Sequence, residues 1–241
     1  MELLILGIDT TTLACSVALL DGEALLAEFT LNIRKTHSER LMPLIDALLK
    51  ESAIEREQLQ AVAVAAGPGS FTGIRIGVST ARALAQGLDI PAVGVSTLQA
   101  LAEAVPSPGA LICPLLDARR NEVYSALYRR EAHPPRGLEM LIPPAAVELG
   151  PFAERLKTYG EPIVFTGEGL NSYASYLSEA LGGLAVLPEA PQRACRAAWV
   201  ALCGRRLLEQ GHPASFHELL PQYLRRPEAE RRLKERKRGA K

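Results

Sequence analysis

Two aspartates stand where carboxylates could do chemistry. Asp9 ends the apolar run of residues 3–8, and Asp117 ends the apolar run of residues 110–116. In a two-lobed phosphotransferase, carboxylates at such strand ends hold Mg²⁺, and small residues after them let backbone amides reach phosphate oxygens. Thr10 and Thr11 could supply amides and hydroxyls to an anion. The alternative is that Asp9 simply begins a turn, which aspartate favours.

A glycine-rich loop, Gly67 to Gly73 (GPGSFTG), follows the apolar run 61–66 and precedes a helical pattern. Backbone N–H groups at a helix N-terminus attract anions, so Gly67 and Gly69 could approach a phosphate. The GK[ST] ending of a P-loop is missing, however. A sharp turn would require the same glycines, so the loop has both a structural and a functional interpretation.

The residues after Asp117 argue against a second phosphate loop. Residues 118–121 read Ala-Arg-Arg-Asn, and a loop that cradles phosphate needs glycine because side chains keep the backbone away from the oxygens. Arg119 and Arg120 could instead bind an anion or a partner's acid, or form an exposed hairpin tip. We therefore expect only a vestigial cofactor cleft, formed by Asp9, Thr10, Thr11, Gly67, Gly69 and Asp117.

The sequence contains no familiar motif for catalysis or metal binding. The four histidines form no HExxH or HxxxH pair, and the four cysteines have no CxxC spacing. We expect no catalytic residue and no metal site in this chain. Scattered cysteines are typical of reduced thiols, and the sequence shows neither a positively charged leader nor a membrane-length apolar run. These features predict a cytoplasmic protein without membrane contact.

The order of apolar runs predicts an α/β protein with two lobes. Hairpin strands followed by alternating strands and helices occur twice, around the linker Pro106 to Gly109. We expect one lobe over 1–105, a second over 106–220 and a basic tail over 221–241. A helix near 193–210 lies in the second range and could pack back on the first lobe.

Two first-lobe segments carry more apolar surface than one buried stripe requires. The pattern of residues 38–50 spans roughly 160°, and residues 74–87 form two apolar stripes, whereas a core-facing helix needs about 100°. Surplus apolar surface predicts a helix-to-helix interface with another chain. Cover by the second lobe or by the helix near 193–210 is the alternative. The predicted interface residues are Leu41, Met42, Leu44, Ile45, Leu48, Ile74, Gly77, Val78, Ala81 and Ala85.

The charge of the chain is distributed unevenly. Net charge is zero overall, but residues 221–241 hold nine basic and three acidic side chains and carry +6. Such asymmetry indicates an arm that meets an anionic partner, and a solvated terminal helix is the alternative. The predicted tRNA contacts are Arg225, Arg226, Arg231, Arg232 and Arg236.

Four segments together resemble one bacterial family. They read GIDTTTLACSVAL, THSERLMPLIDALL, GPGSFTGIRIGVSTARALAQGL and LLDARRNEVYSALY, and cover most of residues 1–130. This combination is similar to the TsaB (YeaZ-type) family, within the sugar kinase, heat-shock and actin-like superfamily. The resemblance implies a two-lobed, ribonuclease H-like fold with mixed sheets flanked by helices. It also implies a relationship to the catalytic TsaD subunit, whose metal-binding histidine pair is missing from this sequence.

The resemblance implies a scaffold role in tRNA modification. Such a subunit pairs with TsaD and the ATPase TsaE to place a threonylcarbamoyl group on the adenosine beside the anticodon. It contacts tRNA through the complex, forms homodimers when alone and binds no cofactor tightly, since its partners supply ATP and Mg²⁺. Two alternatives stay open from the residues alone. One is an ATP-dependent phosphotransferase using Asp9, and the other is a metallopeptidase, which the missing histidine pair disfavours.

Overall fold

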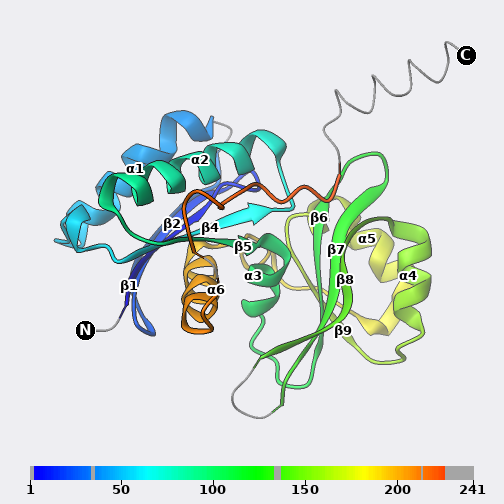
Figure 1. The fold of residues 1–241 in the computed structure, drawn as a ribbon. Helices are drawn as coiled ribbons and strands as arrows, with labels where there is room; N and C mark the ends of the chain where they lie inside the picture. The colour runs from blue at the N-terminus through cyan, green and yellow to red at the C-terminus, as the bar shows by residue number, and fades with distance from the viewer. Residues whose placement is uncertain (1–2, 34–35, 133–136, 213, 226–241) are drawn as a thin grey trace, which may run out of the picture.

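The first lobe is built on a mixed five-stranded sheet. The computed structural model describes residues 3–33, 36–132, 137–212 and 214–225. In this sheet the strands lie in the order β3-β2-β1-β4-β5 (Figure 1). Their bounds are β1 Leu4–Asp9, β2 Cys15–Asp21, β3 Ala24–Leu31, β4 Ala61–Gly67 and β5 Ala92–Ser96. The first three strands pair antiparallel, whereas β4 and β5 run parallel to β1.

The second lobe repeats this arrangement. Its strands follow the order β10-β9-β6-β7-β8, with β6, β7 and β8 antiparallel and β9 and β10 parallel to β6. Their bounds are β6 Leu111–Asp117, β7 Glu122–Arg130, β8 Leu138–Glu148, β9 Ile163–Thr166 and β10 Ala185–Val186. The duplicated topology confirms the predicted two-lobed α/β fold.

Helices cover both faces of the first sheet. Helices α1 (His37–Glu51) and α2 (Phe71–Leu88) share an apolar core with one face of that sheet. Helices α3 (Thr97–Glu103) and α6 (Ala197–Glu209) share a second core with the other face and with β6 and β7 of the second sheet. Side chains alternate along a strand, so neighbouring residues such as Ile5 and Leu6 enter different cores.

Helix α6 belongs in space to the first lobe, although its sequence lies within 106–220. A Cβ at Gly7 on β1 would overlap the backbone of Ala197, and a Cβ at Gly204 would overlap Ala63 on β4. Glycine at both positions therefore lets the helix backbone and the sheet approach closely. In Figure 1 the orange α6 stands against the blue and cyan strands of the first lobe.

Two elements of the second lobe were not expected. Strand β8 contains Pro143 and Pro144, which are unusual inside a strand. A strand at the edge of a sheet has one unpaired side, so it tolerates proline. Helix α5 (Leu170–Leu181) was also missed, and with α4 (Leu149–Lys157) it covers the outer face of the second sheet. Short 3-10 turns occupy Arg56–Gln58, Gly182–Leu184 and Ala190–Gln192.

Within the described ranges, none of the helices combines the length and the apolar character needed to cross a bilayer.

Candidate functional site

The Asp9 carboxylate is buried and partly used by its own turn. The residue is 1% exposed, and its Oδ1 accepts hydrogen bonds of 2.7 Å from both the amide and the hydroxyl of Thr11. Its Oδ2 is buried without a hydrogen-bond partner in the described part of the chain. This arrangement is an aspartate-initiated turn that keeps one carboxylate oxygen uncommitted.

Cysteine thiols line the buried side of Asp9. Burial, with the negative charge of Asp9 as a smaller cause, raises the pKa of Cys195 well above its ordinary value. Burial and the same carboxylate raise the pKa of Cys15 to about 11. These thiols stay neutral at physiological pH, so they are poor nucleophiles and poor metal ligands.

The glycine loop packs against the threonine turn. The Thr10 hydroxyl donates to the carbonyl of Gly73 at 2.7 Å, and the Ser70 amide donates to the carbonyl of Thr11 at 2.6 Å. A Cβ at Gly69 would overlap the Thr11 carbonyl, and one at Gly73 would overlap that of Thr10. The close approach of two backbones therefore accounts for Gly69 and Gly73 without a phosphate.

The other predicted glycine contacts the C-terminal part of the chain. Gly67 has a φ of +126°, and a Cβ there would overlap the carbonyl oxygen of Gln222. The Gln222 amide donates in turn to the carbonyl of Ala66 at 2.7 Å. The chain itself fills the space beside Gly67.

Asp117 lies on the second lobe with partners of its own. Its Oδ1 accepts from the Arg119 amide at 2.7 Å and from the Tyr173 hydroxyl at 3.3 Å. Burial, followed by the charge of Asp117, raises the pKa of Tyr173. The backbone is left-handed at three successive residues of this hairpin, with φ near +60° at Arg119, Arg120 and Asn121. This conformation is energetically unfavourable for residues other than glycine. The β6–β7 hairpin thus ends in a strained tip that bears two arginines, as one of the alternatives predicted.

The acidic side chains do not gather into a preformed metal site in the described part of the chain. Within the described residues, no group of three or more His, Cys, Asp or Glu side chains is placed to hold a metal ion. A cavity of about 660 Å³ lies on the second lobe, where Tyr173, Tyr176, Glu148 and Arg225 contribute to its lining. Neither Asp9 nor the glycine loop lines this cavity. Among the residues that the structure describes, Asp9 therefore lacks the clustered carboxylates of a preformed metal site.

The prediction that α1 and α2 carry surplus apolar surface is wrong for nine of its ten residues. Met42 is 47% exposed, but the other nine positions are buried. The two helices lie side by side on one face of the first sheet (Figure 1). Phe216 and Leu219 pack into the same core. A helix that packs on a sheet and on a neighbouring helix buries two stripes, so a broad apolar face needs no second chain. The buried nine are Leu41, Leu44, Ile45, Leu48, Ile74, Gly77, Val78, Ala81 and Ala85.

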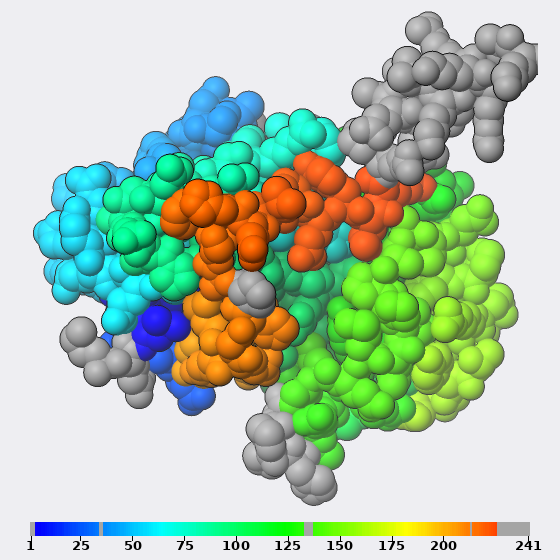
Figure 2. Space-filling model, in the orientation of Figure 1, coloured from blue at the N-terminus to red at the C-terminus, as the bar shows by residue number. Residues whose placement is uncertain are grey.

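Residues 214–225, which we name the C-terminal strap, connect the two lobes. The strap begins where the Ala92 amide on β5 donates to the carbonyl of Ala214 at 2.8 Å. It ends at Arg225, which donates to the carbonyl of Ala118 at 2.8 Å and forms an ion pair with Glu122. In Figure 2 the strap's orange-red atoms run across the surface from the first lobe to the second.

Arg225 is therefore corrected from a predicted tRNA contact to an intramolecular anchor. Its side chain is 18% exposed and is held by the second-lobe hairpin. The remaining predicted contacts, Arg226, Arg231, Arg232 and Arg236, lie outside the described residues.

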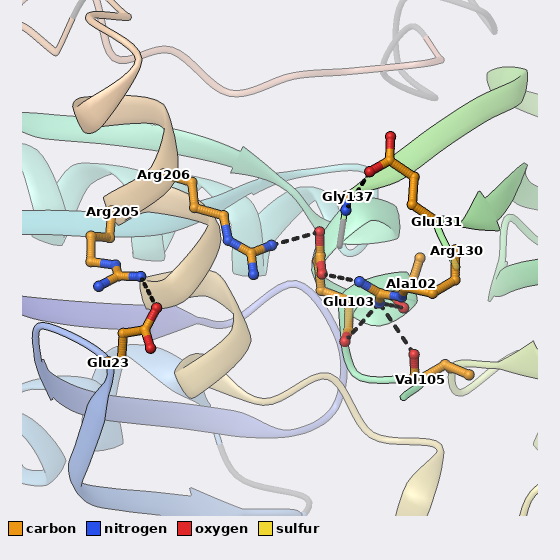
Figure 3. A network of polar contacts seen from close by, with 9 residues as sticks. All are labelled: Glu23, Ala102, Glu103, Val105, Arg130, Glu131, Gly137, Arg205 and Arg206. Atoms are coloured by element: carbon orange, nitrogen blue, oxygen red, sulfur yellow. Dashed lines mark hydrogen bonds and ion pairs between the residues drawn. The ribbon is translucent and has the colours of Figure 1, made fainter. Parts of the chain in front are cut away.

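A buried charge cluster at the base of the lobes was missed from the sequence. Glu103 at the end of α3 accepts from Arg130 on β7 at 2.6 Å and from Arg206 on α6 at 3.0 Å (Figure 3). Arg130 also donates to the carbonyls of Ala102, Glu103 and Val105. The Arg130 and Glu103 side chains are only 7% and 5% exposed. Glu103 and Arg130 are 27 residues apart and give no spacing signal, so the pair becomes visible only when the lobes are assembled.

Comparison with known proteins gives consistent matches. A family model described as "TsaD: tRNA N6-adenosine threonylcarbamoyltransferase" matches residues 24–233. The chain is 35% identical to the tRNA threonylcarbamoyladenosine biosynthesis protein TsaB of Bacillus subtilis, over 94% of this chain and 96% of the relative. The Escherichia coli TsaB protein is 36% identical over 53% of this chain and 55% of its own. YeaZ from Pseudomonas aeruginosa has a similar structure, with a TM-score of 0.77 and 28% identity over 93% of this chain and 100% of that one.

Proposed function

Because the chain belongs to the TsaB family of tRNA threonylcarbamoyladenosine biosynthesis proteins, we propose that it is a non-catalytic subunit docking on a TsaD-type catalytic subunit. The observation that carries the proposal is that the groups of the predicted cofactor site are engaged with one another. Asp9 Oδ1 is bonded to Thr11, and the glycine loop is packed against Thr10 and Thr11. A subunit whose predicted cofactor site is engaged in this way acts by binding its catalytic partner.

The proposed docking face is the outward side of α2. Ser79, Ala83 and Gly87 recur at four-residue spacing and are exposed, so they form one strip along the helix. A Cβ at Gly87 would meet nothing within 4 Å. Small side chains let a second helix approach closely, because the distance between helix axes is set by the residues at the contact. This strip replaces the buried residues as the surface on which a partner helix would lie.

The proposed complex has two further partners. A TsaE-type ATPase and tRNA join through the catalytic subunit, and the partners supply ATP and Mg²⁺. Without a catalytic subunit, the same α2 face pairs two copies of the chain. The complex works in the cytoplasm, in line with the reduced, buried state of all four cysteines.

Reconstitution tests the proposal. The chain, a TsaD-type subunit, a TsaE-type ATPase, the threonylcarbamoyl donor and tRNA are mixed, each component is omitted in turn, and modified adenosine is measured. We expect modification to require both this chain and the TsaD-type subunit. Ala83→Arg should weaken their association at least about tenfold, equivalent to about 1.4 kcal/mol, while the isolated chain stays folded. Modification by this chain and donor alone, or unchanged association of Ala83→Arg, would refute the proposal.

One observation favours a second candidate, an ATP-dependent phosphotransferase. Asp9 Oδ2 is buried without a partner in the described residues, and an uncommitted carboxylate oxygen can accept Mg²⁺. Calorimetry with ATP and Mg²⁺ distinguishes the candidates. Saturable binding that is lost in Asp9→Ala supports the phosphotransferase, and its absence supports the docking subunit.

A further inference from the structure

We propose that the docking surface of α2 continues onto the C-terminal strap, where Leu220, Tyr223 and Leu224 contact the TsaD-type partner. The inference rests on the proposed function and extends it to a segment more than a hundred residues away in sequence. It assigns to the strap a role in partner binding beyond its role in connecting the lobes.

The strap concentrates exposed apolar side chains. Leu220 is 62% exposed, and Tyr223 and Leu224 are each 37% exposed. They are three of the eleven large apolar side chains that are exposed in the described chain, yet they lie within five residues of one another. A single exposed leucine is ordinary, whereas a cluster of apolar side chains on one short segment marks an interaction site.

Leu220, Tyr223 and Leu224, which we name the strap patch, adjoin α2. The Tyr223 ring stacks on Phe71, the first residue of α2, with ring centroids 4.8 Å apart. Arg75, one turn later on α2, donates to the Tyr223 hydroxyl at 2.9 Å and lies over the Phe71 ring at 3.9 Å. Arg75 is exposed and shares its helix face with Ser79 and Ala83. A partner lying along the α2 strip would therefore meet Arg75 and then Tyr223.

The strap is held on both sides of the patch. Leu219 is 5% exposed in the first-lobe core, and the Gln222 amide is bonded to Ala66. Arg225 anchors the far end on the hairpin of the second lobe. Leu220, Tyr223 and Leu224 are thus displayed on a segment that is already ordered, and pre-ordering lowers the entropic cost of association.

The size of the α2 strip gives an independent reason for a larger surface. An 18-residue helix is about 27 Å long and about 10 Å wide, so one face covers about 270 Å². A stable protein–protein interface buries about 800 Å² on each partner. The α2 strip alone falls well short of this area, and the strap is the neighbouring apolar surface connected to it.

The chemistry of the patch favours a protein over a nucleic acid. Arg75, which contacts Tyr223, is engaged with Phe71 and Tyr223, and Arg225, which follows Leu224, is engaged with Ala118 and Glu122. The outward groups are two leucines and a tyrosine ring, which match the apolar and aromatic centre of a protein interface.

The test compares three single variants by calorimetric titration against the TsaD-type subunit. Leu220→Asp introduces a charge into the patch, Ala83→Arg blocks the α2 strip, and Met140→Asp is the matched control. Met140 is 54% exposed on β8 of the second lobe, far in the fold from α2. We expect Leu220→Asp to weaken binding at least about tenfold and Met140→Asp to leave it unchanged. Unaltered thermal unfolding of each variant shows that the fold is intact.

The outcomes separate this inference from the proposed function. If Ala83→Arg weakens binding and Leu220→Asp does not, the strap inference is wrong and the docking proposal stands. If neither variant weakens binding, both are wrong. Loss of only self-association or only tRNA binding in Leu220→Asp would assign the patch to a second copy or to RNA and would overturn the inference.

Discussion

The guanidinium of Arg130 donates to the carboxylate of Glu103 at 2.6 Å, and this buried ion pair joins the second lobe to the first. Arg130 ends β7 on the second sheet, whereas Glu103 ends α3, which packs on the first. Glu168 makes another contact between the lobes, because its Oε2 accepts from the Leu13 amide at 3.2 Å. Together with the strap, these contacts join the two lobes at three separate places.

Loss of Arg130 should strongly destabilise the protein. In Arg130→Ala the buried Glu103 keeps only Arg206, and removing one member of a buried pair costs about 3–5 kcal/mol. Urea unfolding measures the change in the free energy of unfolding. The neighbouring Arg129 pairs with Glu161 at the surface, with 32% and 49% of the side chains exposed, so Arg129→Ala should cost less than about 1 kcal/mol. Similar losses in the two variants would contradict the assignment.

Two alanines on α2 should respond oppositely to the same substitution. Ala81 is 0% exposed in the core between α2 and the sheet, so Ala81→Arg buries an unpaired charge and should prevent folding. Ala83 faces outward, so Ala83→Arg should change the free energy of unfolding by less than about 0.5 kcal/mol. Circular dichroism during heating measures both. A folded Ala81→Arg would show that the core assignment is wrong.

Two glycines on the same helix should also differ. Gly73→Ala places a Cβ against the carbonyl of Thr10 and should destabilise by about 1–3 kcal/mol. Gly87→Ala adds a Cβ in open space within a helix and should stabilise by about 0.5–1 kcal/mol. Chemical denaturation of the two variants gives the comparison, and stabilisation by Gly73→Ala would remove the packing explanation of the glycine loop.

Alkaline pH should destabilise the protein through its buried thiols. Burial raises the pKa of Cys113 from 9.0 to about 12 and that of Cys203 to about 12. Above pH 9 the unfolded thiol loses its proton while the folded thiol keeps it, so the unfolded state binds fewer protons. The free energy of unfolding should therefore be unaffected by these thiols below pH 9. It should fall toward pH 12 by up to about 1.4 kcal/mol per pH unit for each thiol.

Cys113→Ala provides the control for this pH dependence. The thiol lies 3.3 Å from the Ser125 hydroxyl inside the second lobe, and alanine replaces it with a group that does not titrate. Urea denaturation between pH 8 and pH 10 should give a shallower decline for the variant. Identical slopes would exclude Cys113 as a source of the alkaline sensitivity.

Local sequence patterns sufficed to predict the fold class, the two aspartates at strand ends and the two long helical segments of the first lobe. Hydrophobic period and turn residues are local signals, and the first lobe consists of hairpins and strand–helix units that carry them. The same rules failed at β8, where prolines obscured an edge strand, and at α5, which they did not predict.

Which groups cover each surface depends on the assembled fold. Periodicity placed Leu48 and Ala81 on apolar faces of their helices. It could not show that the sheet and the neighbouring helix bury those faces. Thr10 meets Gly73, Glu28 meets Arg196 and Arg225 meets Ala118 across 63, 168 and 107 residues. Contacts at such separations depend on how two sheets and their helices assemble, because the free energy that fixes them comes from packing, which no local pattern of residues records.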